Sequence, residues 1–194
     1  MTAIPSSHSD LASRGKWIAT AGWLIILLGA GAALLPMLER RGGAIVIGVL
    51  LIAGGLIEIL AGSLRHAARP LALVTGAVTI FAGTLFATET ATRFFLPAVT
   101  IVMGWLFVRA ILLALTSRLT SGGVRRWTLI AAATDFLLAL VLLVGIQIAS
   151  LVVALLGVTE PLIASFAWIL ALSFLVTGLW LLETASCERE RETS

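Results

Sequence analysis

Four ionisable residues lie inside long apolar runs of the sequence, namely Glu58, Arg109, Asp135 and Glu183. A charged side chain at the centre of a bilayer costs about 2.5–3.5 kcal/mol on insertion scales, so it usually faces a partner or a water-filled cavity. Arg109 is the single charge in the run 96–116, which is as long as a membrane-spanning helix. The chemistry open to these residues is ion pairing, or the binding of protons or ions, inside a membrane.

The four residues also lie at similar depths in their runs. Each is six to nine residues from a polar or aromatic marker near one end of its run, which is roughly 9–14 Å at a helical rise of about 1.5 Å per residue. Glu183 is the shallowest and can reach the lipid headgroups. We expect Arg109 to pair with Asp135, with Glu58 or with both.

Three interpretations of this charged layer stay open. It can act as a structural staple that fixes how the helices dock, because burying two opposite charges together costs less free energy than burying each alone. It can act as a proton- or ion-responsive site, because intramembrane carboxylates often mark such pathways. Alternatively, each side chain snorkels to the membrane surface without pairing.

The composition places the chain in a membrane. Of its 194 residues, 60% are hydrophobic and only 12% are charged, whereas soluble domains carry roughly 25% charged residues. A water-soluble protein this apolar could not cover its own surface. We expect an integral membrane protein with the lipid bilayer as its partner. No nucleic-acid partner is expected, because the sequence has no basic stripe with interleaved aromatic residues.

The sequence offers little for cofactors or catalysis. A lone Cys187 excludes an internal disulfide, and no cysteine–histidine cluster offers a metal site, because His8 and His66 stand alone. The signatures of metalloproteases, serine hydrolases, P-loop enzymes, dinucleotide-binding folds and kinases are absent from the sequence. The sequence therefore predicts a protein without cofactor or metal that is not an enzyme.

Apolar runs bounded by charges, glycine or proline give six candidate membrane spans. The runs are continuous rather than alternating, which favours helices over a barrel. We expect one six-helix domain over 17–187, between tails at 1–16 and 188–194, with spans at 17–38, 43–64, 70–88, 95–116, 127–148 and 161–183. The first run is longer than the apolar core of a signal peptide, so we expect a retained helix. The stretch 150–159 either extends the fifth helix, lies in the interface or dips back into the protein.

The distribution of lysine and arginine predicts the orientation. If the spans alternate in direction, nine of these cations fall on one side, three fall on the other, and Arg109 lies inside a span. Cytoplasmic loops carry the excess of positive residues in membrane proteins. We therefore expect both termini in the cytoplasm.

The spans also suggest an internal threefold repeat of helical hairpins, at 17–66, 67–119 and 122–187, with a period near 50 residues. In the second helix of each hairpin, a glycine precedes an ionisable residue by four or five positions, as in Gly104 and Arg109. Small residues let helix backbones approach closely. We expect this packing role for Gly29, Gly48, Gly54, Gly55, Gly62, Gly76 and Gly104.

These features together resemble the HdeD-like family of small six-helix bacterial membrane proteins. The likeness covers about 17–187 and rests on glycine-rich helices such as GWLIILLGAGAALLP and GVLLIAGGLIEILAGS. Arg109 in FVRAILLAL and Asp135 in AATDFLLALVLL match charged positions of the corresponding family helices. The third hairpin departs most, because SLVVALLGVTEP is longer and more apolar than the usual connection. The resemblance implies a non-enzymatic protein of the bacterial inner membrane that supports acid or envelope stress tolerance.

Two other functions stay open from the sequence. One is a small oligomeric transporter or channel that uses the intramembrane Glu/Arg/Asp layer, since internal repeats and buried charges are compatible with transport. The other is a membrane adaptor that stabilises another complex through its glycine faces. Besides lipid, the possible partners are a second copy of the chain or another membrane protein. A continuous water-filled cavity would favour transport, and a solid bundle with an exposed glycine-rich groove would favour the adaptor.

Overall fold

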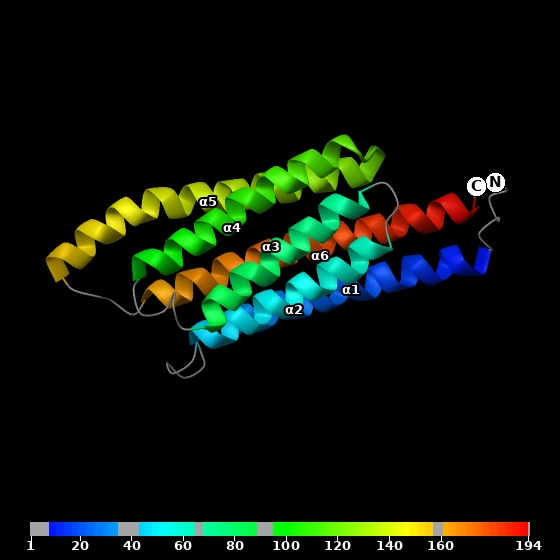
Figure 1. The fold of residues 1–194 in the computed structure, drawn as a ribbon. Helices are drawn as coiled ribbons and strands as arrows, with labels where there is room; N and C mark the ends of the chain where they lie inside the picture. The colour runs from blue at the N-terminus through cyan, green and yellow to red at the C-terminus, as the bar shows by residue number, and fades with distance from the viewer. Residues whose placement is uncertain (1–7, 35–42, 65–67, 89–94, 157–160, 194) are drawn as a thin grey trace.

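The chain forms six α-helices over the residues that a computed structural model describes, namely 8–34, 43–64, 68–88, 95–156 and 161–193. Their bounds are α1 (His8–Leu34), α2 (Gly43–Ser63), α3 (Arg69–Ala87), α4 (Phe95–Arg118), α5 (Gly122–Leu156) and α6 (Pro161–Thr193). The helices lie side by side in one elongated bundle (Figure 1). Side chains are described for 14–34, 45–64, 68–88, 99–144 and 168–187.

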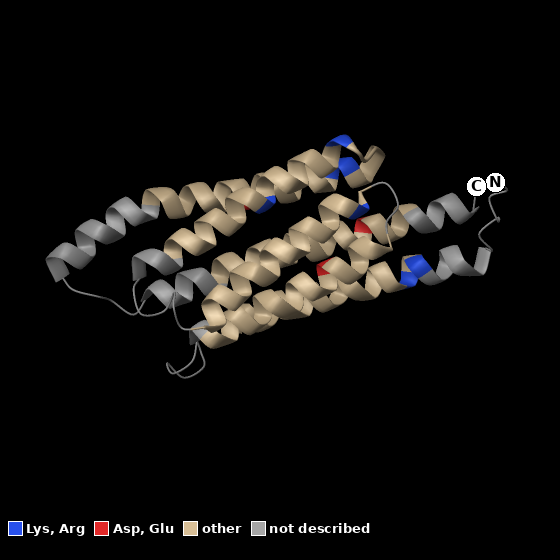
Figure 2. Ribbon diagram, in the orientation of Figure 1, with Lys and Arg blue, Asp and Glu red and all other residues tan. Residues whose placement is uncertain are grey.

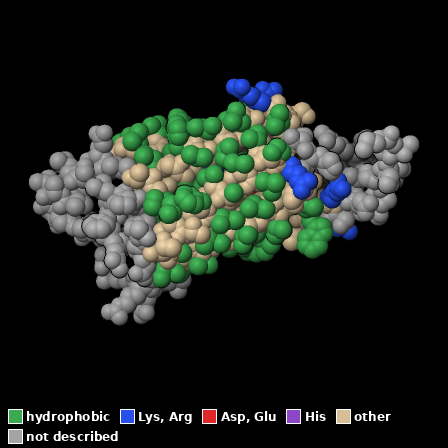
Figure 3. Space-filling model, in the orientation of Figure 1, with side chains coloured by type: hydrophobic (Ala, Val, Ile, Leu, Met, Phe, Trp, Pro, Cys, Tyr) green, Lys and Arg blue, Asp and Glu red, His purple; other side chains and the backbone are tan. Residues whose placement is uncertain are grey.

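Each helix contains a stretch of 19 to 23 residues that is apolar enough to cross a membrane. A helix satisfies its own backbone hydrogen bonds, which a spanning segment must do in hydrocarbon. Large apolar side chains are spread over the face of the bundle that Figure 3 shows, and Trp23, Leu27, Phe81 and Val141 are each more than half exposed. An apolar exterior of this kind is suited to contact with lipid rather than water. The prediction of an all-α, six-helix, multi-pass membrane protein is confirmed.

The closest helix pairs differ from the expected hairpins. The most extensive contacts join α1 to α6, α2 to α3, and α4 to α5. The expected pairs α1–α2, α3–α4 and α5–α6 also touch, but less extensively. Each inner helix has two neighbours along the chain, and the first and last helices can also meet, so hydrophobicity alone does not decide which pairs pack most closely. The threefold repeat itself stays a prediction.

Glycines explain the close approach of α2 to α3. A Cβ on Gly55 would lie 2.7 Å from the carbonyl oxygen of Gly76, and a Cβ on Gly48 would lie 2.8 Å from that of Gly83. Gly48 and Gly55 are seven residues apart, as are Gly76 and Gly83, so each pair lies on one face of its helix. The two backbones therefore meet directly, as small residues allow in membranes.

Small residues also allow α1 and α6 to approach closely. A Cβ on Gly22 would lie 3.0 Å from the carbonyl oxygen of Gly178, and a Cβ on Gly29 would lie 3.0 Å from that of Ala171. Both partners again stand seven residues apart on their helices. Two of the three closest pairs are therefore held by small residues at the same spacing.

Three helices extend several residues beyond the expected spans. The fifth helix continues to Leu156, so the residues 150–156 extend it, while 157–159 lie outside the described residues. The sixth helix runs on to Thr193, through the part of the chain expected as a tail. The first helix begins at His8, within the other expected tail.

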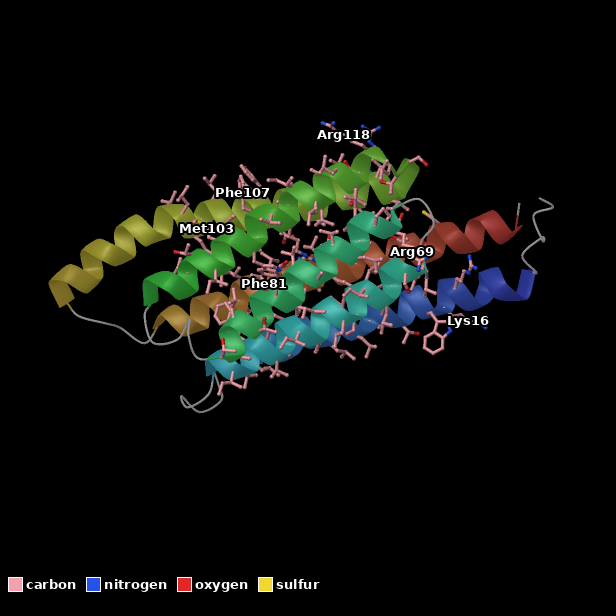
Figure 4. The ribbon with its side chains drawn as sticks, in the orientation of Figure 1. Lys16, Arg69, Phe81, Met103, Phe107 and Arg118 are labelled. Carbon is pink, nitrogen blue, oxygen red and sulfur yellow. The ribbon has the colours of Figure 1, made fainter. Side chains whose placement is uncertain are left out.

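Basic residues gather at the end of the bundle where α1 begins and α6 ends (Figure 2). We call this the basic end; Lys16, Arg69 and Arg118 mark it in Figure 4. Arg14 in α1, close to Lys16, and Arg125 and Arg126 in the first turns of α5, just after Arg118, belong to the same group. Arg40, Arg41 and Arg93, the three cations expected on the opposite side, lie outside the residues whose side chains are described.

Candidate functional site

The site is built around the Arg109 side chain, which α4 holds in the middle of the bundle at 0% exposure. Its NH2 group donates to Oε1 of Glu58 on α2, and its NH1 group donates to Oδ2 of Asp135 on α5 at 3.1 Å. Glu58 is 6% exposed and Asp135 is 2% exposed. We call these three residues the charge cluster. It joins three helices, with Arg109 between both of the carboxylates proposed from the sequence.

Two hydroxyl groups bring α6 into the same network. NH1 of Arg109 also donates to Oγ of Ser173 at 2.7 Å, and NH2 also donates to Oγ1 of Thr177 at 2.6 Å. The Ser173 hydroxyl in turn donates to Oδ1 of Asp135 at 2.7 Å. Both hydroxyls are buried. The guanidinium therefore uses four of its donors on three other helices.

An indole and a further hydroxyl close the network on the α3 side. The Trp105 ring lies 5.6 Å from the Arg109 guanidinium carbon, one turn earlier on α4, within cation–π range. Nε1 of Trp105 donates to Oγ1 of Thr79 at 3.1 Å. The Thr79 Oγ1 atom also lies 3.1 Å from the Thr75 carbonyl oxygen and 3.3 Å from Oε2 of Glu58.

Glu183 is not part of this network. Its side chain is partly exposed and lies against the first turn of α5, where a Cβ on Gly123 would be 2.7 Å from Oε1 of Glu183. Of the four ionisable residues predicted to share a layer, the structure brings three together and places Glu183 nearer the basic end. This agrees with its shallower position in the sequence.

The predicted packing glycines fall into two groups. Six of them face another helix: beyond the pairs already described, a Cβ on Gly54 would meet the Phe174 ring at 2.5 Å, and one on Gly62 would meet the Ala72 Cβ at 2.7 Å. Gly104 differs from the expectation, since it is exposed and a Cβ added to it would have no described atom within 4 Å. Gly104 therefore faces outward rather than into a helix contact.

Two small cavities flank the charge cluster. One, of about 20 Å³, lies toward the basic end and is lined by Glu58, Thr75, Thr116 and Trp180 among others. The second, of about 10 Å³, lies on the opposite side and has an apolar lining that includes Leu51, Phe86 and Trp105. The hydrogen-bonded set of Trp105, Thr79 and Glu58 stands between the two cavities.

The sequence reasoning missed the neutral partners Ser173, Thr177, Thr79 and Trp105. Ser173 and Thr177 are four residues apart in a run of apolar residues, so they share a helix face. Thr79 and Trp105 stand similarly inside apolar runs. That spacing was a usable signal for Ser173 and Thr177, although serine and threonine in helices commonly bond their own turn instead.

Comparison of the chain with known protein families, curated proteins and solved structures finds no match of any of the three kinds. The six candidate spans establish a multi-pass membrane protein. Within the described residues, no group of three or more histidine, cysteine, aspartate or glutamate side chains could hold a metal ion.

Proposed function

We propose that this chain is a non-enzymatic protein of the bacterial inner membrane that supports tolerance to acid or envelope stress. The observation that carries the proposal is the charge cluster, in which two carboxylates and one guanidinium meet in the bundle interior. Ionisable side chains at this depth are costly, and they commonly serve proton or ion responses. The resemblance of the FVRAILLAL and AATDFLLALVLL segments to HdeD-like proteins supports the same role.

The proposed orientation places the basic end in the cytoplasm, together with both termini. All six described cations outside the charge cluster lie at that end (Figure 2). Cytoplasmic loops are enriched in such residues. An excess of protons in the cytoplasm would then reach the protein from the basic end.

A membrane adaptor is the second candidate function. Gly104 on α4 is open, and its neighbours Phe107, Val108 and Ile111 are exposed apolar residues. A helix face that combines a small residue with exposed apolar ones suits close packing against another membrane helix, from a second copy or from another protein. Transport is less favoured, because Trp105, Thr79 and Glu58 fill the space between the two cavities.

Survival at low pH tests the proposed function. A strain lacking the gene is complemented with wild type, Arg109→Ala or Asp135→Asn, at membrane abundances matched by immunoblotting. We expect wild type to restore survival and both variants to fail, because each leaves a member of the charge cluster without its partner. Equal survival with all three proteins would show that the cluster has a purely structural role. If wild type did not restore survival, the proposed function would be contradicted.

A further inference from the structure

The short turn between α4 and α5 carries a group of cations outside the charge cluster. Arg118 is the last residue of α4, and Arg125 and Arg126 lie in the first turns of α5. These two helices pack closely, and Gly122 joins them with a φ of 59°. Glycine adopts this left-handed conformation without strain, so the chain can reverse within a few residues. We call Arg118, Arg125 and Arg126 the arginine patch, which the turn holds at one end of a single helix pair.

The arginine patch is open to an anion. All three side chains are exposed, and Arg118 points away from the bundle in Figure 4. Within the part of the chain that the structure describes, Arg109 forms ion pairs with carboxylates and none of the three patch arginines does so. Glu183 lies against the same turn, but on the side of Gly123. Positive charge therefore exceeds negative charge at this turn.

Apolar side chains lie one helical turn deeper, on the same faces as the arginine patch. Leu115 precedes Arg118 by three residues on α4, and Leu129 follows Arg126 by three residues on α5. Residues at this spacing are neighbours on a helix surface. Leu115 is 41% exposed and Leu129 is 45% exposed. Both helices enter candidate membrane spans here, so the surface changes from cationic to apolar as a phospholipid changes from headgroup to acyl chain.

We propose that the arginine patch binds an anionic phospholipid, whose phosphate contacts the guanidinium groups and whose acyl chains lie along the apolar side chains beneath them. A guanidinium can donate two parallel hydrogen bonds to phosphate oxygens. The apolar side chains favour a lipid over a free phosphate, because only a lipid has chains to lay against them. This inference concerns lipid binding alone and stands whether or not the chain supports stress tolerance.

Native mass spectrometry of the purified protein tests the preference. The protein is mixed with equal amounts of phosphatidylglycerol and phosphatidylcholine that have the same acyl chains. We expect wild type to retain several-fold more phosphatidylglycerol than phosphatidylcholine. The triple variant Arg118→Gln, Arg125→Gln and Arg126→Gln should lose most of this preference. No preference in wild type would overturn the proposal.

A second triple variant, Arg14→Gln, Lys16→Gln and Arg69→Gln, is the matched control. It removes the same amount of charge from the basic end, but these three cations are divided between α1 and α3. We expect it to keep the preference for phosphatidylglycerol. Equal losses in the two triple variants would show diffuse attraction to the whole basic end and would overturn a site at the arginine patch.

Fluorescence quenching tests where the lipid lies. Trp127 directly follows Arg126 and is partly exposed, and the difference between wild type and Trp127→Phe isolates its emission. In phosphatidylcholine–phosphatidylglycerol vesicles, either lipid carries brominated acyl chains, which quench nearby indoles. We expect brominated phosphatidylglycerol to quench Trp127 several-fold more than brominated phosphatidylcholine at equal mole fraction. Equal quenching by the two lipids would contradict the proposed site.

Added salts distinguish a lipid from a free anion. Sodium phosphate and sodium chloride at equal ionic strength screen charges alike, so both should weaken the quenching preference to the same extent. A larger loss in sodium phosphate would show that the arginine patch binds the free anion, and would overturn the assignment to lipid.

Discussion

At the scale of single residues, Arg109 can be buried because its guanidinium donates hydrogen bonds to several groups at once. A guanidinium presents several donors in a fixed plane, so it can bond two carboxylates and two hydroxyls at once, which a lysine could not do in the same geometry. The four partners come from α2, α5 and α6. A charge that would be costly alone becomes the centre of a connected network.

Ser173→Ala tests the contribution of the neutral partners. The Ser173 hydroxyl accepts from Arg109 and donates to Asp135, so its removal leaves one donor and one acceptor buried. We expect a loss of about 1–3 kcal/mol in the free energy of unfolding, measured by denaturation in mixed micelles.

Ser117→Ala is the matched control for that measurement. Ser117 is also buried, but its hydroxyl donates to the Ala114 carbonyl oxygen in its own helix. Such a bond is local, and its loss should cost much less. Equal losses in the two variants would show that Ser173 contributes no more than a hydroxyl bonded to its own turn.

At this scale the sequence predicted the charged members of the site but not the neutral ones. Arg109 and its two carboxylates stand out because any charge in an apolar run needs a partner. Ser173 and Thr177 do not stand out, because helical hydroxyls have an acceptor in their own turn whichever way they face. Only the placement of α6 in the bundle, where it packs against α1 and α5, decides that they point at the guanidinium.

At the scale of helices, small residues at a spacing of seven set the closest pairs. Gly48 and Gly55 face Gly83 and Gly76, and no side chain separates the two backbones. The six spans were predictable from hydrophobicity, but the pairing was not, because hydrophobicity is nearly uniform around each helix. The matched glycine spacing in α2 and α3 was the one sequence feature that pointed to this pair.

Gly55→Ala tests that role. The added Cβ would lie 2.7 Å from the Gly76 carbonyl oxygen, so α2 and α3 must separate. We expect a loss of about 1–3 kcal/mol in the free energy of unfolding, as for overpacked cores. Gly104→Ala is the matched control, since its added Cβ would have no described atom within 4 Å, and it should cause no loss. A larger loss of unfolding free energy in Gly104→Ala than in Gly55→Ala would contradict this account of the α2–α3 contact.

At the scale of the whole molecule, the charge cluster and its hydroxyl partners tie together helices from all three close pairs. Glu58 belongs to the α2–α3 pair, Arg109 and Asp135 to the α4–α5 pair, and Ser173 to the α1–α6 pair. Glycine contacts hold two of these pairs internally, while the polar network connects the pairs to one another. Apolar side chains cover much of the face that Figure 3 shows, as suits a bundle of membrane-spanning helices.

The most direct test of the charge cluster compares two variants in lipid bicelles at slightly alkaline pH. Arg109→Met leaves two buried carboxylates without their cation, and we expect it to lower the free energy of unfolding by about 3–5 kcal/mol. The triple variant Arg109→Met, Glu58→Gln and Asp135→Asn removes all charge, and we expect it to regain most of that loss. A triple variant less stable than Arg109→Met, or a single variant as stable as wild type, would contradict a buried, mutually compensating cluster.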